Sequence, residues 1–263
     1  MKPLVFWTLF CAASCLPDMQ VPVVLGHDSQ AEPRSWPLVR RLPSADATQA
    51  AAADARYLYA VSNKRVVVYD RQSEQQVMIS EGDAMHLNSA FVHDQRVFCA
   101  HSNYPRQPEQ SEIRVFDPET GKLEIFHDFG ESEGSLTWAI FDRGHWWCHF
   151  AFYGAENSRS YLAKFDAEWQ ELDRWTIPEA VVRQLGKYSL SGGVWHGEDL
   201  LVTGHDDPIL FRLQLPQEGS QLVYIGQDTA PVTGQGIAID PTTGGLVGIQ
   251  RRARQIVLTD RPQ

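Results

Sequence analysis

The chain has 263 residues, of which 43% are hydrophobic and 11% aromatic, so it has enough apolar material for a packed core and is not a disordered chain. Its formal net charge of −10 argues against a nucleic-acid surface, because phosphate backbones are bound by an excess of Lys and Arg. One basic cluster, formed by Arg251, Arg252 and Arg254, has the charge to hold an anionic ligand.

The first residues have the pattern of an export signal. Lys2 supplies a positive charge, and Leu4–Ser14 is an apolar run of signal-peptide length that is too short to span a bilayer. Cys15 follows small residues, as in lipoprotein processing, but the usual Leu three residues earlier is missing. Ordinary secretion and a lipid anchor on Cys15 therefore both stay open.

The rest of the chain is expected to be one exported domain. We expect a signal peptide over residues 1–15, a linker over 16–34 and a single domain over 35–263, located in the periplasm, at the cell surface or outside the cell. Cys99 and Cys148 lie within apolar runs and are expected to be buried thiols, although an oxidising compartment leaves a disulfide open. We expect a monomer whose membrane contact is limited to the lipid anchor.

A repeated feature predicts the fold. Apolar runs end in an aromatic residue and an Asp at Asp70, Asp117 and Asp166, which lie 47 and 49 positions apart. Matching strands end near Leu215 and Asp260, so the chain carries five marks at a near-constant period. An Asp at the end of a strand caps the following turn by accepting backbone hydrogen bonds, so the repeated Asp is interpreted as structural.

Each period divides into four short strands separated by turn signals, which favours an all-β propeller of five four-stranded blades over a sandwich; six blades are less well supported. The last unit lacks a fourth strand, and we expect Trp36–Leu42 to supply it and close the ring. The one helical stretch is Glu179–Leu185. The expected inner strands are Thr48–Ala53, Leu87–Val92, Leu136–Phe141, Gly192–Trp195 and Gly236–Asp240.

In such a blade the inner strand starts, and the second strand ends, at the same face, so these loops surround one mouth of the channel. Unusual polar residues gather there, whereas the opposite face has ordinary turns. The residues expected to bind a ligand at this mouth are Asn103, Tyr104, Trp138, Tyr153, Tyr188, Gln235 and Arg251. Packing within and between blades is an equally good explanation of the aromatic residues in this set.

Four residues are candidates for catalysis. His101 and His205 occupy equivalent positions in two repeats and have the residue type for proton transfer near neutral pH. Asp206 either orients the His205 ring or begins a turn, and Glu133 is a candidate acid. His101, His149 and His205 together would suit a divalent metal ion, although His149 is out of register; hydrogen bonding within loops remains the other explanation of these histidines.

Five segments together resemble a group of secreted bacterial five-bladed propellers of the YVTN or quinoprotein-like type. The resemblance extends over about residues 85–258 and implies the propeller fold and export. The segments that carry it are His101–Pro105, Gly134–Trp138, Tyr188–Gly193, Gly204–Pro208 and Gly234–Ala238.

The chain also resembles, more distantly, the plant-type glutaminyl cyclases, which are secreted five-bladed propellers. Their inner strands carry a Thr-Gln-Gly element that Thr233–Gly236 only approximates. The resemblance implies a glutamate at the mouth as proton shuttle, and Glu133 is the nearest match.

The sequence leaves the function open among three alternatives. The first is an enzyme acting on a small molecule or saccharide at the mouth, by hydrolase, lyase or cyclase chemistry. The second is a non-catalytic propeller that binds a ligand or protein. The third is a structural propeller at the cell surface. Convergence of His101, His205 and at least one carboxylate on a common point would favour the enzyme, whereas side chains that point apart would favour binding or structure.

Overall fold

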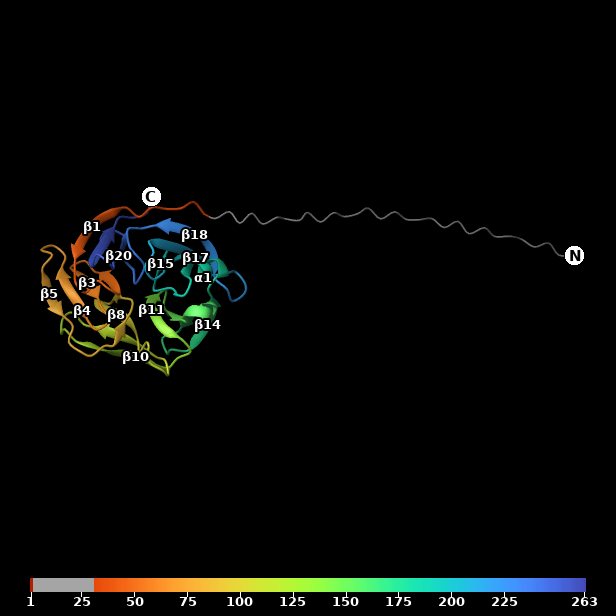
Figure 1. Cartoon of the computed structure of the whole chain (residues 1–263), viewed down its shortest axis with the longest axis horizontal. Helices are drawn as coiled ribbons and strands as arrows, with labels where there is room; N and C mark the ends of the chain where they lie inside the picture. The colour runs from red at the N-terminus through yellow and green to blue at the C-terminus, as the bar shows by residue number, and fades with distance from the viewer. Residues whose placement is uncertain (2–30) are drawn as a thin grey trace.

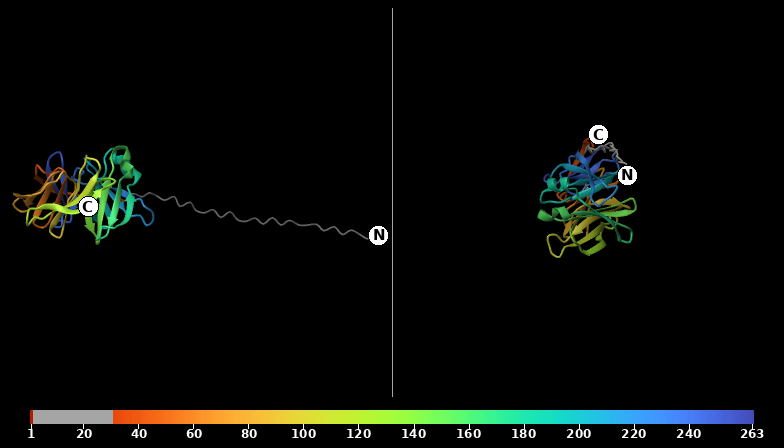
Figure 2. Two further views of the ribbon diagram at one scale, coloured as in Figure 1. Left: turned by 90° about the horizontal axis from the view of Figure 1, so that it is seen from below. Right: turned by 90° about the vertical axis from the view of Figure 1, so that its right-hand side faces the viewer.

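Five antiparallel β-sheets stand around a common axis in the computed structural model, which describes Met1 and residues 31–263 (Figure 1). The five-bladed propeller predicted from the repeat is confirmed. Seen from the side, the ring is short along its axis (Figure 2). The signal peptide, the lipid anchor on Cys15 and most of the expected linker lie outside the described residues.

Within each of the first four blades the strands follow one another in sequence from the axis outward, and the fifth blade takes its outer strand from the start of the domain. Blade one contains β2 (Ala50–Ala53), β3 (Tyr57–Val61), β4 (Val66–Asp70) and β5 (Gln76–Ile79); blade two contains β6 (His86–Leu87), β7 (Phe91–His93), β8 (Arg96–Ser102), β9 (Gln110–Phe116) and β10 (Leu123–Glu131). Blade three contains β11 (Ser135–Asp142), β12 (His145–Ala151), β13 (Tyr161–Phe165) and β14 (Glu171–Thr176); blade four contains β15 (Gly192–His196), β16 (Asp199–Thr203), β17 (Ile209–Gln214) and β18 (Val223–Thr229); blade five contains β19 (Ala238–Ile239), β20 (Leu246–Gln250), β21 (Gln255–Thr259) and β1 (Leu38–Pro43).

The inner strands approach one another closely because they carry small residues. All four alanines of β2 are buried. A Cβ on Gly236 would lie 2.5 Å from the Cβ of Ala50, and a Cβ on Gly192 would lie 2.4 Å from the backbone oxygen of Gln235. No side chain fits at either glycine unless the strands move apart, so blades one, four and five meet backbone to backbone.

The inner strand of blade two is not continuous, which corrects the prediction of one strand over Leu87–Val92. It forms β6 and β7, which both pair with β8 and are separated by Asn88–Ala90. The Asn88 amide donates to the backbone oxygen of Leu136 in blade three at 3.0 Å. Asn side chains commonly replace regular hydrogen bonds between strands by local ones, and here the Asn88 bond to the next blade coincides with the break in the inner strand.

The repeated aspartates cap turns, as predicted. Asp70 Oδ1 accepts from the Ser73 N–H at 2.8 Å, and Asp117 Oδ1 accepts from the Glu119 N–H at 2.8 Å. Asp166 makes the same kind of bond in blade three. The three turns join the third strand of a blade to the fourth, so the period seen in the sequence marks the outer half of each blade.

The N-terminal segment closes the ring. β1 pairs antiparallel with β21 as the outer strand of blade five, which confirms the predicted closing strand with a shift of bounds from 36–42 to 38–43. Trp36 instead lies buried against blade four, where its indole N–H donates to Asp228 Oδ2 at 3.1 Å. Ser35 forms a parallel bridge with Thr229. The segment therefore ties blade four to blade five before it becomes the closing strand.

Helical structure is scarce, as expected. The α-helix α1 (Glu179–Leu185) has the predicted bounds, and a 3₁₀ helix, η1 (Gly154–Arg159), follows the second strand of blade three. No helix in the described part of the chain is long and apolar enough to cross a membrane.

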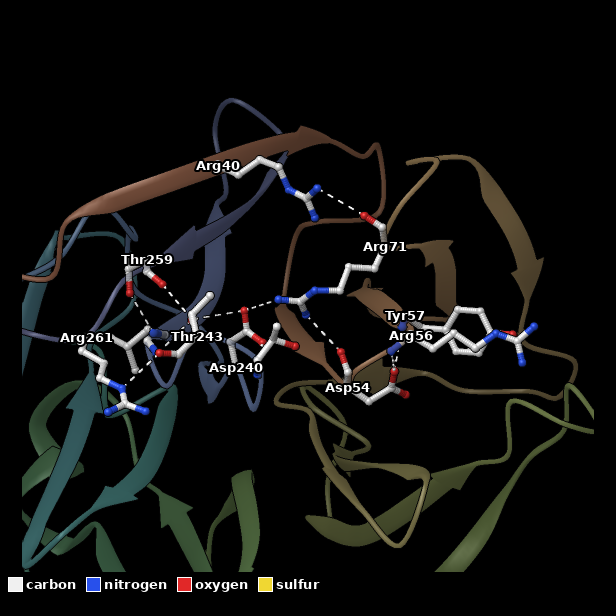
Figure 3. Close-up of polar contacts among 12 residues, drawn as sticks. Arg40, Asp54, Arg56, Tyr57, Arg71, Asp240, Thr243, Thr259 and Arg261 are labelled. Atoms are coloured by element: carbon white, nitrogen blue, oxygen red, sulfur yellow. Dashed lines mark hydrogen bonds and ion pairs between the residues drawn. The ribbon is translucent and has the colours of Figure 1, made fainter.

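A buried ion pair joins the first and last blades on the face opposite the mouth (Figure 3). Arg71 pairs with Asp240, whose side chain is fully buried, and also donates to the backbone oxygen of Asp54 at 3.0 Å. Arg40, from β1, donates to the backbone oxygen of Arg71 at 3.2 Å. Asp240 also caps the turn before β20. The pair and the bond from Arg40 therefore connect three segments at the closure, namely β1, the turn after β4 and the turn before β20.

Replacing Arg71 tests this closure. Arg71→Met should lower the free energy of unfolding by about 3 kcal/mol, because it leaves the buried Asp240 carboxylate without its counter-charge. Urea denaturation would measure the change. The control is Arg183→Met, which removes an exposed pair with Glu179 and should change stability by less than about 0.5 kcal/mol. Equal stability of the two variants would contradict the role assigned to Arg71.

Candidate functional site

The starts of the inner strands and the loops after the second strands enclose a cavity of about 450 Å³, which we call the mouth cavity. All five blades contribute to its wall, as the register of the repeat predicted. The residues that line it are Gln49, Asn63, His86, Asn88, Tyr104, Thr137, Tyr153, Gly154, Lys187, Tyr188, Ser191, His205, Gln235 and Arg251.

His205 lies on the loop between β16 and β17 and has a polar partner on each ring nitrogen. Its Nδ1 is 2.7 Å from Asp206 Oδ2, and its Nε2 is 3.2 Å from Arg251 Nη1. A guanidinium only donates, so Nε2 accepts, and Nδ1 carries the proton that is donated to Asp206. Arg251 therefore occupies the ring nitrogen that Asp206 leaves available.

Two further contacts fix His205 in place. The Tyr188 ring stacks on the imidazole, with ring centroids 4.0 Å apart and an interplanar angle of 8°. The Gln235 amide donates to the backbone oxygen of His205 at 2.6 Å. Blades four and five thus set both the ring plane and the backbone of His205, so the position of this imidazole is preorganised.

The mouth cavity has a cationic wall. Lys187 and Arg251 are its charged lining residues, and no Asp or Glu is among the residues that line it. Asp206 lies beside the cavity, 3.6 Å from Arg251. Partial burial works against ionisation of Asp206, but the hydrogen bond from His205 and the charges of Arg251 and Arg252 lower the pKa of its carboxyl. The cavity therefore suits an anionic ligand.

The wall on the side of blades two and three is aromatic. The rings of Tyr104 and Tyr153 have centroids 5.3 Å apart, and His86 lies 5.7 Å from Tyr104. Burial raises the pKa of Tyr153 to about 12, so its hydroxyl stays protonated at neutral pH. Burial, followed by the charge of Arg251, lowers the pKa of His86. This wall therefore adds flat, uncharged surface to the cavity.

Four amide side chains line the cavity, and each has one end held by the protein. The Gln49 amide donates to Asn63 Oδ1, Asn88 donates to Leu136, and Gln235 donates to His205. Three of the four, Gln49, Asn63 and Asn88, were not among the predicted site residues. Their positions in the repeat are the signal that identifies them. Gln49 precedes an inner strand, Asn63 follows a second strand, and Asn88 interrupts an inner strand.

Six of the predicted site residues meet in the mouth cavity, and Asp206 joins them through its bonds to His205 and Arg251. The six are Tyr104, Tyr153, Tyr188, His205, Gln235 and Arg251. Lys187, Thr137 and Ser191 also line the cavity and were not predicted. Lys187 lies in the long connection before blade four, where the repeat gives no register.

His101 lies outside the mouth cavity and faces a separate pocket beside Asn103. Its Nε2 accepts from the Met85 N–H at 3.0 Å, and its Nδ1 lies 3.1 Å from Glu112. Burial, with the charges of Arg114 and His86, lowers its pKa to about 4. Unlike His205, His101 lies within a strand, because β8 extends to Ser102 and dictates the direction of the side chain.

Trp138, His149 and Glu133 also lie away from the cavity lining. Trp138 and His149 are fully buried and stacked, with ring centroids 5.4 Å apart. His149 Nδ1 donates to the Thr137 hydroxyl, which in turn donates to the backbone oxygen of Leu190. Glu133 is exposed and lies 3.6 Å from Arg174. These placements give Trp138 and His149 a packing role beneath the cavity.

The three histidines predicted as a metal site are held by different partners, Glu112 and Met85 for His101, Thr137 for His149 and Asp206 for His205. Within residues 31–263, no three His, Cys, Asp or Glu side chains are grouped as a metal site requires. Cys99 and Cys148 are buried and unpaired in the described part of the chain, as the apolar runs around them predicted.

Comparisons with known proteins bear on the fold. No family model matches the chain, and no curated protein matches its sequence. Among solved structures it is similar to a glutaminyl cyclase from Myxococcus xanthus, with a TM-score of 0.60 and 11% identity, over 88% of this chain and 99% of that one. A hydrazine synthase from Kuenenia stuttgartiensis matches with a TM-score of 0.49 and 14% identity, over 80% of this chain and 63% of that one. At 11% identity the first likeness shows the propeller fold alone.

The buried histidine beneath the cavity makes a pH-dependent prediction. Burial lowers the pKa of His149 to about 3, whereas in the unfolded chain it titrates near about 6.5. As the pH falls, the unfolded state therefore binds this proton before the folded state does. The contribution of neutral His149 to the free energy of unfolding is fully present above pH ~6.5 and is lost progressively below it. Between pH 7 and pH 5, the wild type should lose about 2 kcal/mol more stability than His149→Gln. Urea denaturation at both pH values measures this, and parallel losses would contradict it.

Proposed function

We propose that this chain is an enzyme that acts on a small anionic molecule or saccharide in the mouth cavity, with His205 as the proton acceptor. The observation that carries the proposal is the arrangement of Asp206, His205 and Arg251 at the cavity wall. His101 lies in a separate pocket, so the two histidines do not converge and the proposal rests on His205 alone, with a carboxylate that orients its ring and a cation that attracts the ligand.

Arg251 gives the site two states. Without an anion it donates to His205 Nε2 and occupies the lone pair of the base. An incoming carboxylate competes for the guanidinium, because a charge-assisted bidentate bond is stronger than a bond to a neutral nitrogen. Binding therefore moves Arg251 onto the ligand and frees His205 Nε2. Asp206 then stabilises the imidazolium that forms when Nε2 takes a proton.

The aromatic wall supplies the remaining contacts. Tyr104 and Tyr153 form a surface for a flat or ring-shaped ligand. The Tyr153 hydroxyl, kept protonated by burial, can donate a hydrogen bond to an oxygen of the ligand. The ligand therefore lies between a cationic wall from blades four and five and an aromatic wall from blades two and three.

Two other reactions receive less support. Glycoside hydrolysis by a pair of carboxyl groups needs both to flank the bond, and no lining residue of the cavity is an Asp or Glu. A glutaminyl-cyclase-like acyl transfer draws support from the fold likeness, but Glu133, its expected proton shuttle, lies exposed beside Arg174. A propeller that binds the same ligand without converting it is the remaining alternative, and a turnover experiment separates the two.

A turnover screen with wild type and His205→Ala tests the proposal. The probes are sugar acids, small carboxylic acids and a peptide with an N-terminal glutamine, each followed by mass spectrometry. We expect conversion of a sugar acid or carboxylic acid, and at least about a 100-fold lower kcat for His205→Ala, because general-base catalysis contributes that much.

His145→Ala is the matched control, since it removes a histidine from the opposite face and should leave kcat unchanged. Conversion of the glutaminyl peptide alone would favour the cyclase alternative. Binding of a probe without conversion by the wild type would favour the binding propeller. Equal conversion by wild type and His205→Ala would overturn the role given to His205.

A further inference from the structure

A second concave surface continues outward from the mouth cavity over blades one and five. It shares Gln49, Asn63 and Arg251 with the cavity, so one ligand can occupy both without leaving the protein surface. We call it the basic groove. Its five cationic lining residues are Lys64, Arg65, Arg251, Arg252 and Arg254.

The basic groove is unusual for this chain. Its lining has five cations against two carboxylates, Asp46 and Asp206, whereas the whole chain has a formal net charge of −10. Local positive potential on an acidic protein concentrates anions at that place. The excess of positive charge is therefore specific to the basic groove, whereas the chain as a whole is negative.

Some of these cations are already engaged. Arg65 makes a bidentate pair with Asp46 at 2.9 and 3.1 Å, and Arg254 donates to the backbone oxygen of Ala45 at 2.7 Å. Lys64 and Arg252 are exposed, and among residues 31–263 neither makes a hydrogen bond or an ion pair, although the charge of Arg252 helps to lower the pKa of Asp206. These two cations are thus free to pair with negative groups on a ligand that extends out of the cavity.

The mouth cavity presents hydrogen-bond acceptors that hydroxyl groups of a ligand can satisfy. Gln49, Asn88 and Gln235 each use the NH₂ end of the amide on a protein acceptor, which leaves the three amide oxygens without a donor in the described part of the chain. Carbonyl oxygens accept hydrogen bonds from hydroxyls and repel carboxylates. A ligand that satisfies the cavity therefore combines several hydroxyls with a carboxylate, the latter directed to Arg251 or Lys187.

We propose that the ligand is an acidic oligosaccharide, a chain of uronic acids with one ring in the mouth cavity and the following rings along the basic groove. The proposal rests on the function proposed above and adds the substrate class and a second binding site. Each sugar ring has the vicinal hydroxyls that the amide oxygens require and the face that the tyrosines require. Each following carboxylate meets Lys64 or Arg252.

An acidic peptide fits less well. Its side chains supply the negative charge for the groove, and its backbone N–H groups can donate to the amide oxygens, but acidic residues bring no ring face for Tyr104 and Tyr153. The observations therefore favour the saccharide, and the peptide is an outcome of the test.

Calorimetric titration tests the proposal with tetramers of galacturonate, mannuronate and glucuronate, each beside its own monomer. We expect at least one tetramer to bind about ten-fold tighter than its monomer. The double substitution Lys64→Glu and Arg252→Glu should weaken that tetramer about ten-fold or more, with a smaller salt dependence, and leave the monomer unchanged. Arg183→Glu on α1 is the control for an added negative charge elsewhere and should change neither affinity.

The outcomes separate this inference from the proposed function. If no tetramer binds more tightly than its monomer, or if the groove variant binds the tetramer as the wild type does, the inference is wrong, whereas the turnover result for His205→Ala still decides the function. Binding of tetraglutamate or of neutral maltotetraose as tightly as the uronic-acid tetramer also overturns it, because the first would show charge alone and the second no charge recognition.

Discussion

The contact between inner strands is the constraint on which the rest of the structure depends. Five blades enclose a smaller ring than a larger number would, and here the strands meet where Gly236 lies against Ala50 and Gly192 lies against the backbone of Gln235. At these two contacts, among blades one, four and five, the approach leaves no room for a side chain on Gly236 or Gly192. The polar side chains of the mouth cavity lie at or near the starts of the inner strands and in the loops after the second strands, and every blade adds at least one of them.

Ring closure also supports the site through blade five. Ring closure by β1 and the buried Arg71–Asp240 pair fix blade five against blade one, so Gln235 and Arg251 reach the cavity from a firmly held frame. Gln235 then holds the backbone of His205 from the neighbouring blade. The charges at the site are separated. Lys187 and Arg251 line the cavity, Asp206 lies beside it, and further cations line the basic groove. Although the chain carries a net negative charge, the mouth cavity and the basic groove together form a concave surface that suits an anion.

The sequence predicted the fold more completely than the site. Asp70, Asp117 and Asp166 recur because each caps an equivalent turn, and an unpaired last unit required a closing strand, so both inferences depended only on local chemistry and repetition. The site depends on which way a side chain points. His101 and His205 looked equivalent, but His101 lies within β8, so its direction follows the strand, whereas His205 lies beyond the end of β16. Contacts between blades, such as the bond from Asn88 to Leu136, leave no pattern in the sequence.

The central claim is that Arg251 covers the proton-accepting nitrogen of His205 until an anion draws it away. Nuclear magnetic resonance of the ¹⁵N-labelled His205 ring, recorded with and without a saturating uronic-acid ligand, tests it most directly. The account predicts a proton on Nδ1 and an unprotonated, hydrogen-bonded Nε2 before the addition, and loss of the Arg251 bond at Nε2 after it. A proton on Nε2 before the addition, or an unchanged Nε2 environment with the ligand bound, would contradict it.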